Sequence, residues 1–204
     1  MGAVRGISRT TAAAIVAALA LAAPASAQFS EGYNFLKAVR DGDGTKAMEF
    51  LNKPGAPALN ARDNTSGESA LHIVIKRHDQ GWLGFLLSRG AQVEAKDRAG
   101  NTPLITAVQL SDPESVRALL QYGAKVNATN ASGETPIIIA VQRRDLPSIR
   151  LLIQNGADPK IADHVAGKNA RDYAAEDARG TATLKVLDEA KPKPTITMGP
   201  MIKP

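Results

Sequence analysis

The sequence predicts an all-α repeat solenoid, a stack of about five helix pairs joined by projecting turns. The phrases "GESALHIVIK", "GNTPLITAVQ" and "GETPIIIAVQ" begin at Gly67, Gly100 and Gly133, so one pattern recurs every 33 residues. Each copy carries two apolar stripes at helical spacing and ends in a Gly-Ala dipeptide. Units of this length cannot bury their apolar faces alone, so they must stack on one another.

The helix pairs follow from the apolar residues in each copy. These residues recur at positions i, i+3 and i+4, which places them on one face of a helix. The first-helix sets are Leu71, Val74, Ile75; Leu104, Ala107, Val108; and Ile137, Ala140, Val141. The second-helix sets are Leu83, Leu86, Leu87; Val116, Leu119, Leu120; and Ile149, Leu152, Ile153. Each unit is therefore predicted to be a pair of short helices.

Proline and glycine mark where these helices begin and end. Thr102-Pro103 and Thr135-Pro136 place a capping hydroxyl before a proline, which suits the first turn of a helix. Asp112-Pro113 opens a second helix in the same way. The second helices end at glycines, which favour left-handed backbone there: Gly90, Gly123 and Gly156.

Together these features resemble the ankyrin repeat, whose opening Gly-x-Thr-Pro-Leu, helix pair, Gly-Ala end and projecting turn are matched over residues 64–163. The tetratricopeptide repeat has a similar length but lacks the Thr-Pro-Leu opening. The resemblance implies two antiparallel helices in each unit. It also implies a non-catalytic protein–protein interaction module that needs no cofactor.

The ends of the repeat array are degenerate. Residues 33–63 lack the Thr-Pro-Leu opening, and residues 167–190 have few large apolar side chains and many charges, as a terminal unit facing water requires. We predict a repeat domain over residues 28–190, followed by a disordered, proline- and lysine-rich tail over residues 191–204. The predicted units are 30–63, 64–97, 98–130, 131–163 and 164–190.

The N-terminus has the pattern of a cleaved signal peptide over residues 1–27. Arg5 and Arg9 precede an apolar run from Thr11 to Ala23, and small residues follow Pro24. The apolar run has 13 residues, whereas a membrane-spanning helix needs about 20. An uncleaved membrane anchor is the alternative. No later segment of the sequence is apolar enough to span a membrane.

Charge and cysteine content limit the partner and the compartment. The net charge is +5, and removal of Arg5 and Arg9 with the signal peptide lowers it to +3, which does not indicate nucleic acid. The chain has no cysteine, so disulfides and thiol chemistry are excluded. An exported protein without cysteine fits a bacterial periplasm. Secretion to act on a host protein is the alternative, and we expect a monomer.

The resemblance implies that a protein partner meets the turn tips and the exposed, concave face of the first helices. Among these residues, Arg77 and Arg143 should flank Leu110 in the stacking direction, with Tyr122 nearby. Arginine and tyrosine beside an exposed leucine are typical of interface anchors, although single surface arginines can simply be solvated. The predicted partner-binding residues are Lys76, Arg77, Arg98, Asn101, Gln109, Leu110, Tyr122, Glu134, Gln142 and Arg143, with Thr65, Ser66, Glu68, Arg89 and Asn155 as further members of this surface.

No residue pattern predicts catalysis, a cofactor or a metal. His72, paired with Ser69, occupies the histidine position of the ankyrin pattern and should make structural hydrogen bonds. Ile105 and Ile138 take this place in the next two units, which predicts more apolar junctions there. His78 and His164 have no companion at metal-ligand spacing. An enzyme or ligand binder built on the repeat scaffold is therefore the least favoured alternative.

Overall fold

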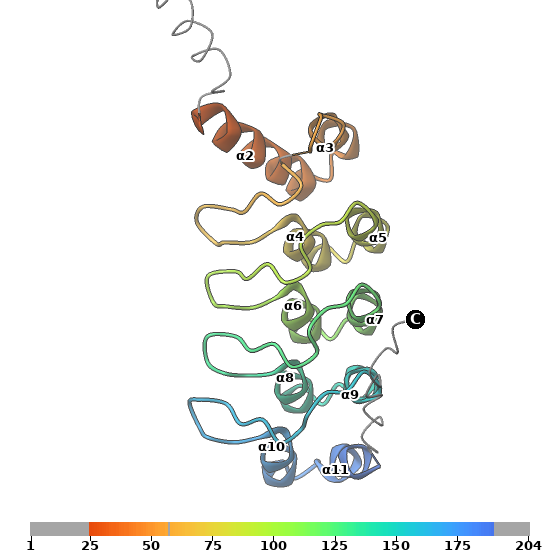
Figure 1. Cartoon of the computed structure of the whole chain (residues 1–204). Helices are drawn as coiled ribbons and strands as arrows, with labels where there is room; N and C mark the ends of the chain where they lie inside the picture. The colour runs from red at the N-terminus through yellow and green to blue at the C-terminus, as the bar shows by residue number, and fades with distance from the viewer. Residues whose placement is uncertain (1–24, 57, 190–204) are drawn as a thin grey trace, which may run out of the picture.

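The computed structural model describes residues 25–56 and 58–189. The predicted tail and nearly all of the predicted signal peptide lie outside these residues. Within them, ten helices form five pairs that stack in one direction (Figure 1). The first helices are α2 (Ala25–Asp41), α4 (Ala70–Lys76), α6 (Pro103–Gln109), α8 (Pro136–Gln142) and α10 (Ala170–Glu176). The second helices are α3 (Gly44–Leu51), α5 (Gln80–Ser88), α7 (Pro113–Gln121), α9 (Leu146–Gln154) and α11 (Thr181–Asp188). The predicted all-α repeat stack is thus confirmed.

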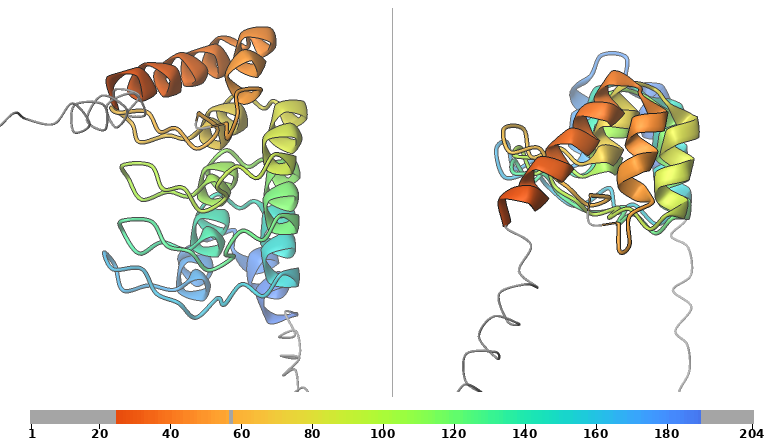
Figure 2. Two further views of the ribbon diagram at one scale, coloured as in Figure 1. Left: turned by 45° about the horizontal axis from the view of Figure 1, so that its top comes forward. Right: turned by 90° about the horizontal axis from the view of Figure 1, so that it is seen from above.

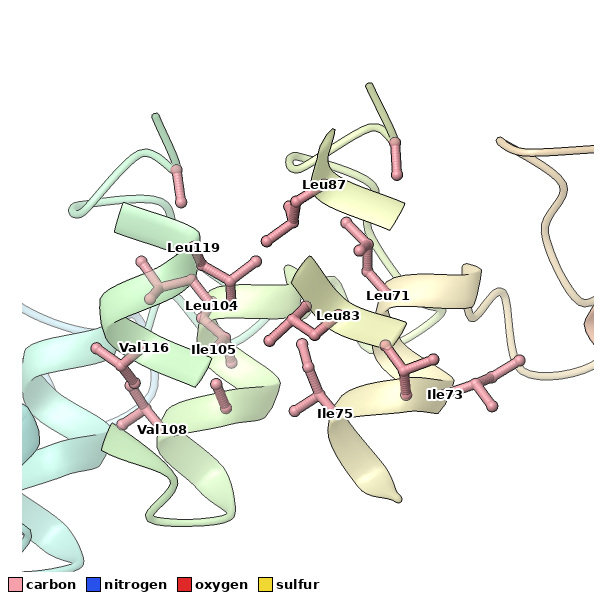
Figure 3. Close-up of a cluster of buried hydrophobic side chains, with 14 of the residues drawn as sticks. Leu71, Ile73, Ile75, Leu83, Leu87, Leu104, Ile105, Val108, Val116 and Leu119 are labelled. Atoms are coloured by element: carbon pink, nitrogen blue, oxygen red, sulfur yellow. The ribbon is translucent and has the colours of Figure 1, made fainter. Parts of the chain in front are cut away.

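The core lies between the helices of each pair and continues from one pair to the next. First helices pack on first helices and second helices on second helices. Leu71 and Leu83 of unit 2 pack toward Leu104 and Leu119 of unit 3, as Figure 3 shows, and all four are at most 1% exposed. Of the predicted apolar positions, only Leu120 and Ile153 are partly exposed.

The helix ends follow the predicted residues with one exception. Thr102 caps α6, because its hydroxyl accepts a hydrogen bond from the backbone N–H of Ile105 at 3.3 Å. Thr135 precedes α8 in the same way, but its buried hydroxyl has no hydrogen-bond partner among the described residues. The capping bond predicted for Thr135 is therefore absent, although the helix still begins at Pro136.

Between the pairs, the chain projects as turns that we call fingers: residues 58–69, 91–102, 124–135 and 157–169 (Figure 2). Successive fingers are joined by backbone hydrogen bonds. For example, Ala131 N–H donates to the Ala99 carbonyl at 3.0 Å. A Cβ on Gly100 would lie 2.6 Å from the Ala131 nitrogen, and the φ of Gly100 is 78°. Close stacking of the fingers thus requires glycine at the start of each repeated phrase.

Helix α2 caps the N-terminal end of the stack. It has 17 residues, whereas α4, α6, α8 and α10 each have seven. The additional turns extend over the first finger (Figure 2), where a Cβ on Gly32 would lie 2.9 Å from the Cβ of Ala61. The helix therefore covers the edge that a preceding finger would otherwise cover. The predicted cleavage point after Ala27 falls in its first turn.

Candidate protein-binding face

The C-terminal ends of the first helices and the roots of the fingers form one continuous surface, which we call the inner face. In Figure 1 the first helices lie between the fingers and the second helices. Because the units stack in one direction, equivalent residues of successive units follow one another along the stack. The inner face is defined by two columns of side chains, described next.

The first column is a series of side-chain pairs that span eight residues within one unit. In each pair, a residue after the finger glycine contacts the last residue of the following first helix. The pairs are Glu68–Lys76, Asn101–Gln109 at 3.3 Å, Glu134–Gln142 at 3.4 Å and Lys168–Glu176 at 2.7 Å. The side-chain pairs of units 2 and 5 are therefore ion pairs. The side-chain pair of unit 3 and that of unit 4 each contain at least one neutral amide.

The negative charge in the unit 2 pair is on the Glu68 carboxyl group, which hydrogen bonds stabilise. Burial alone would raise the pKa of its carboxyl group, but hydrogen bonds from Lys76 and Ser66 outweigh burial and lower the pKa. The Lys76 ammonium is thus neutralised by a carboxylate within its own unit.

The second column contains Arg77, Leu110 and Arg143, which follow the last residues of α4, α6 and α8. They occupy the same position in three successive units, so the predicted arrangement of two arginines on either side of the leucine is present. Leu110 is 36% exposed. Arg77 Nη1 donates to the Val39 carbonyl, and Arg143 Nε donates to the Ser111 hydroxyl at 3.2 Å. Each arginine is thus held by a group of the preceding unit.

Two predicted site residues are not part of the exposed surface around Leu110. Asn101 is only 8% exposed. Its Nδ2 donates to Asp97 at 3.0 Å and its Oδ1 accepts from Gln109, so its polar side-chain atoms are used within the protein. Tyr122 is 49% exposed, but it follows the last residue of α7, whereas Leu110 precedes the helix. The nine residues of α7 correspond to about 14 Å of helix axis, so Tyr122 does not lie near Leu110.

The other predicted residues divide between the inner face and the fingers. Arg98 belongs to a finger, where its guanidinium donates to the Asn64 carbonyl of the preceding finger. Lys76, Gln109, Glu134 and Gln142 lie in the first column. The inner face therefore contains eight of the ten predicted residues: Lys76, Arg77, Asn101, Gln109, Leu110, Glu134, Gln142 and Arg143.

One ion pair beside the inner face is not predicted by the sequence pattern. Arg144 Nε and Nη2 contact the two carboxylate oxygens of Asp177 at 2.5 and 2.7 Å. The hydrogen bond from Arg144 lowers the pKa of Asp177 to about 2. Asp177 directly follows α10, as Arg77, Leu110 and Arg143 follow their helices, so alignment of the degenerate last unit on the others could have found it.

His72 has the predicted structural role. It is 0% exposed. Its Nε2–H donates to the Asn101 carbonyl of the next unit at 3.0 Å, and its Nδ1 accepts from the Ser69 N–H at 3.1 Å and lies 2.9 Å from the Ser69 hydroxyl. These bonds fit the neutral ring, and burial lowers the pKa of His72.

Within residues 25–56 and 58–189, no group of three or more His, Cys, Asp or Glu side chains could hold a metal ion. The helices of the same part of the chain are too short or too polar to cross a bilayer. The inner face itself combines fixed charges, amides and one exposed leucine, which together can bind another molecule non-covalently.

Comparison with known families agrees with this architecture. A model of three consecutive ankyrin repeats matches residues 35–130, and a single ankyrin repeat matches residues 132–164. The first match includes most of the N-terminal unit, which lacks the Thr-Pro-Leu opening. Ankyrin repeats generally mediate protein–protein interactions, and proteins built from them are typically non-enzymatic scaffolds. The chain belongs to the ankyrin repeat family.

Proposed function

We propose that this protein is a non-catalytic, periplasmic interaction module that binds a protein partner through its inner face. The observation that carries the proposal is the second column, in which Leu110 is exposed between two fixed arginines. An apolar side chain bordered by arginines is typical of an interface centre. Because the scaffold holds these side chains in place before binding, little conformational entropy is lost on association.

The proposal is tested by affinity capture with a matched pair of variants. One bait carries Arg77→Glu, Leu110→Glu and Arg143→Glu on the inner face. The control bait carries Arg117→Glu, Gln121→Glu and Arg150→Glu on the exposed surface of α7 and α9. Both sets change the net charge by −5, so non-specific electrostatic effects are equal.

We expect one periplasmic protein to be retained by the unmodified bait and the control bait, and lost from the inner-face bait. Thermal melts must first show that all three baits are folded. Retention by the inner-face bait would place binding on another surface and contradict the proposal. Loss from the control bait alone would assign binding to the second helices.

Periplasmic location is supported by the basic N-terminus, the apolar run from Thr11 to Ala23, the small residues before Gln28 and the absence of cysteine. Mass spectrometry of fractionated cells should find a chain that starts at Gln28 in the periplasm. An intact N-terminus in the membrane fraction would contradict export by a cleaved signal. Recovery from the culture medium would favour an effector that acts on a host protein.

A further inference from the structure

We propose that the segment of the partner that crosses the inner face is extended and acidic, with two carboxylates on either side of an apolar side chain. Arg77 and Arg143 bind the carboxylates, and Leu110 contacts the apolar side chain. This inference rests on the proposed function and names the chemistry of its partner.

The charges of the inner face are not all neutralised. Lys76 is paired with Glu68. Arg144, which follows Arg143 in the chain, is paired with Asp177. Arg143 has no carboxylate within 4.0 Å among the described residues. The positive charge of Arg143 therefore remains available to a partner.

Arg77 differs from Arg143, because it has one long ion pair, with Asp79. Its nearest carboxylate oxygen, Oδ2 of Asp79, lies 3.8 Å from Nη2, which is beyond hydrogen-bond distance. The other oxygen of Asp79 accepts from the Trp82 N–H at 3.0 Å at the start of α5. Arg77 is thus held beside Asp79 without a direct hydrogen bond to it.

Both guanidinium groups are held in place by uncharged acceptors, the Val39 carbonyl for Arg77 and the Ser111 hydroxyl for Arg143. A guanidinium has five N–H donors, so one bond fixes it and leaves donors for a carboxylate. Gly42 provides the space for Arg77, because a Cβ on Gly42 would lie 2.5 Å from Nη2. Arginines fixed in this way lose little side-chain freedom on binding.

The spacing of the column determines the pattern of the ligand. Packed helices lie about 8–10 Å apart, so Arg77 and Arg143, two units apart, are separated by roughly 20 Å. An extended chain rises about 3.3 Å per residue. Two acidic residues about six positions apart, with an apolar residue midway, therefore match the three side chains.

The neighbouring glutamines favour an extended segment over a helix. Gln109 and Gln142 lie beside the column, and each uses its Nε2 in the first column of the face. Their carboxamide oxygens can accept backbone N–H groups. An extended segment has such groups available, whereas those inside a helix are already bonded within the helix.

The test is an NMR titration of the uniformly labelled protein with three peptides. The acidic probe is acetyl-Asp-Gly-Ser-Leu-Ser-Gly-Asp-amide. A basic probe has Lys at both ends, and a polar probe has Ser in place of Leu.

We expect saturable shifts of the amide signals of Arg77, Leu110 and Arg143 with the acidic probe. The polar probe should bind several-fold more weakly, and the basic probe should not bind. Added salt should weaken binding of the acidic probe. No shifts with the acidic probe, or equal shifts with the basic one, would overturn the inference.

Charge reversal provides the matched variant. The pair Arg77→Glu and Arg143→Glu should reverse the preference toward the basic probe. Arg117→Glu and Arg150→Glu, on the second helices, should retain the preference for the acidic probe. If the affinity capture succeeds while the acidic probe fails, only the proposed chemistry is wrong. If the probe binds but no protein is captured, the proposed function is wrong and the affinity of the face for acidic groups stands.

Discussion

Two successive junctions of the stack, α5–α7 and α7–α9, have the same sequence pattern but satisfy their buried polar groups differently. At α5–α7, Asp112 and Ser115 are buried, and Gln80 Nε2 donates to Asp112 Oδ2 and Ser115 Oγ, each at 3.0 Å. Burial would raise the pKa of Asp112, but hydrogen bonds from Ser115 and Gln80 outweigh it and lower the pKa.

At α7–α9 the equivalent residues are Asp145 and Ser148, which are equally buried. Asp145 Oδ2 and Ser148 Oγ have no hydrogen-bond partner among the described residues. Pro113 occupies the place of Gln80 and has no side-chain donor, and the Ser115 Oγ–Asp112 Oδ2 bond of 2.7 Å has no counterpart between Ser148 and Asp145. A buried polar group without a partner costs about 1–3 kcal/mol, so α7–α9 should be the weaker of the two junctions.

The first helices repeat this contrast. His72 joins α4 to the next unit through the Asn101 carbonyl, whereas Ile105 and Ile138 place buried side chains without polar atoms at the same position. The contrast shows that the repeat period fixes where apolar surface is buried. The period does not fix how the polar groups of each junction are hydrogen-bonded, because that depends on individual residues.

The largest change in stability should come from the loss of a buried apolar side chain. Ile105→Ala removes a fully buried side chain and should lower the free energy of unfolding by about 2–5 kcal/mol. Leu110→Ala, at the exposed end of the same helix, is the control and should change it by less than about 0.5 kcal/mol. Urea denaturation measures both. A larger loss from Leu110→Ala would mean that the inner face is part of the core.

The next largest effect concerns the histidine junction. His72→Ile leaves the buried Ser69 N–H and hydroxyl without their acceptor, so unfolding should become easier by about 1–3 kcal/mol. Urea denaturation again measures the change, with Ile138→Val, a small apolar change at the equivalent position, as the control. An unchanged or higher stability would show that the apolar junction is as strong as the bonded one.

Serine substitutions compare the second helices directly. Ser115→Ala removes hydrogen bonds to Asp112 and Gln80 and should cost about 1 kcal/mol. Ser148→Ala removes a hydroxyl that has no partner in the described part of the chain and should be neutral or slightly stabilising. Thermal unfolding of the two variants under identical conditions gives the comparison. Equal losses would show that Ser148 has a partner, such as a bound water.

Acid should weaken the histidine junction. Because the pKa of His72 is lower in the folded protein than its ordinary value of 6.5, the unfolded chain binds more protons as pH falls through 6.5. Stability is therefore retained above pH 6.5 and lost progressively below it. Urea midpoints measured between pH 5 and 8 should fall on the acid side, and part of this decline should disappear in His72→Ile. An identical pH profile in that variant would contradict the assignment to His72.

The smallest change in stability is expected for Pro113→Gln. This variant tests whether Pro113 causes the difference between the α5–α7 and α7–α9 junctions. Pro113→Gln restores at α7–α9 the side chain that Gln80 supplies at α5–α7, while the loss of proline costs a similar amount. The single variant should thus change little. In its background, however, Ser148→Ala should become destabilising by about 0.5–1 kcal/mol, measured by a double-mutant cycle. Additive effects would show that Pro113 is not the reason for the unpaired groups.

The sequence by itself determined the helix pairs, their stacking and their core. Residues such as Leu104 and Leu119 recur with the unit at helical spacing, and any fold that buries them must bring the copies together. It also determined the structural role of His72 and the alignment of Arg77, Leu110 and Arg143, because equivalent positions of a regular stack lie next to one another.

Only the tertiary structure decided which polar side chains are free. Asn101 resembles an exposed turn residue in the sequence, but Asp97 and Gln109 bind it from either side. Tyr122 is separated from Leu110 by the length of α7. Within residues 25–56 and 58–189, the hydroxyls of Thr135 and Ser148 lack the partners that Thr102 and Ser115 have. Apolar burial depends on a periodic pattern that the sequence displays. A hydrogen bond depends on one donor and one acceptor that meet within about 3 Å, and the periodic pattern does not display that distance.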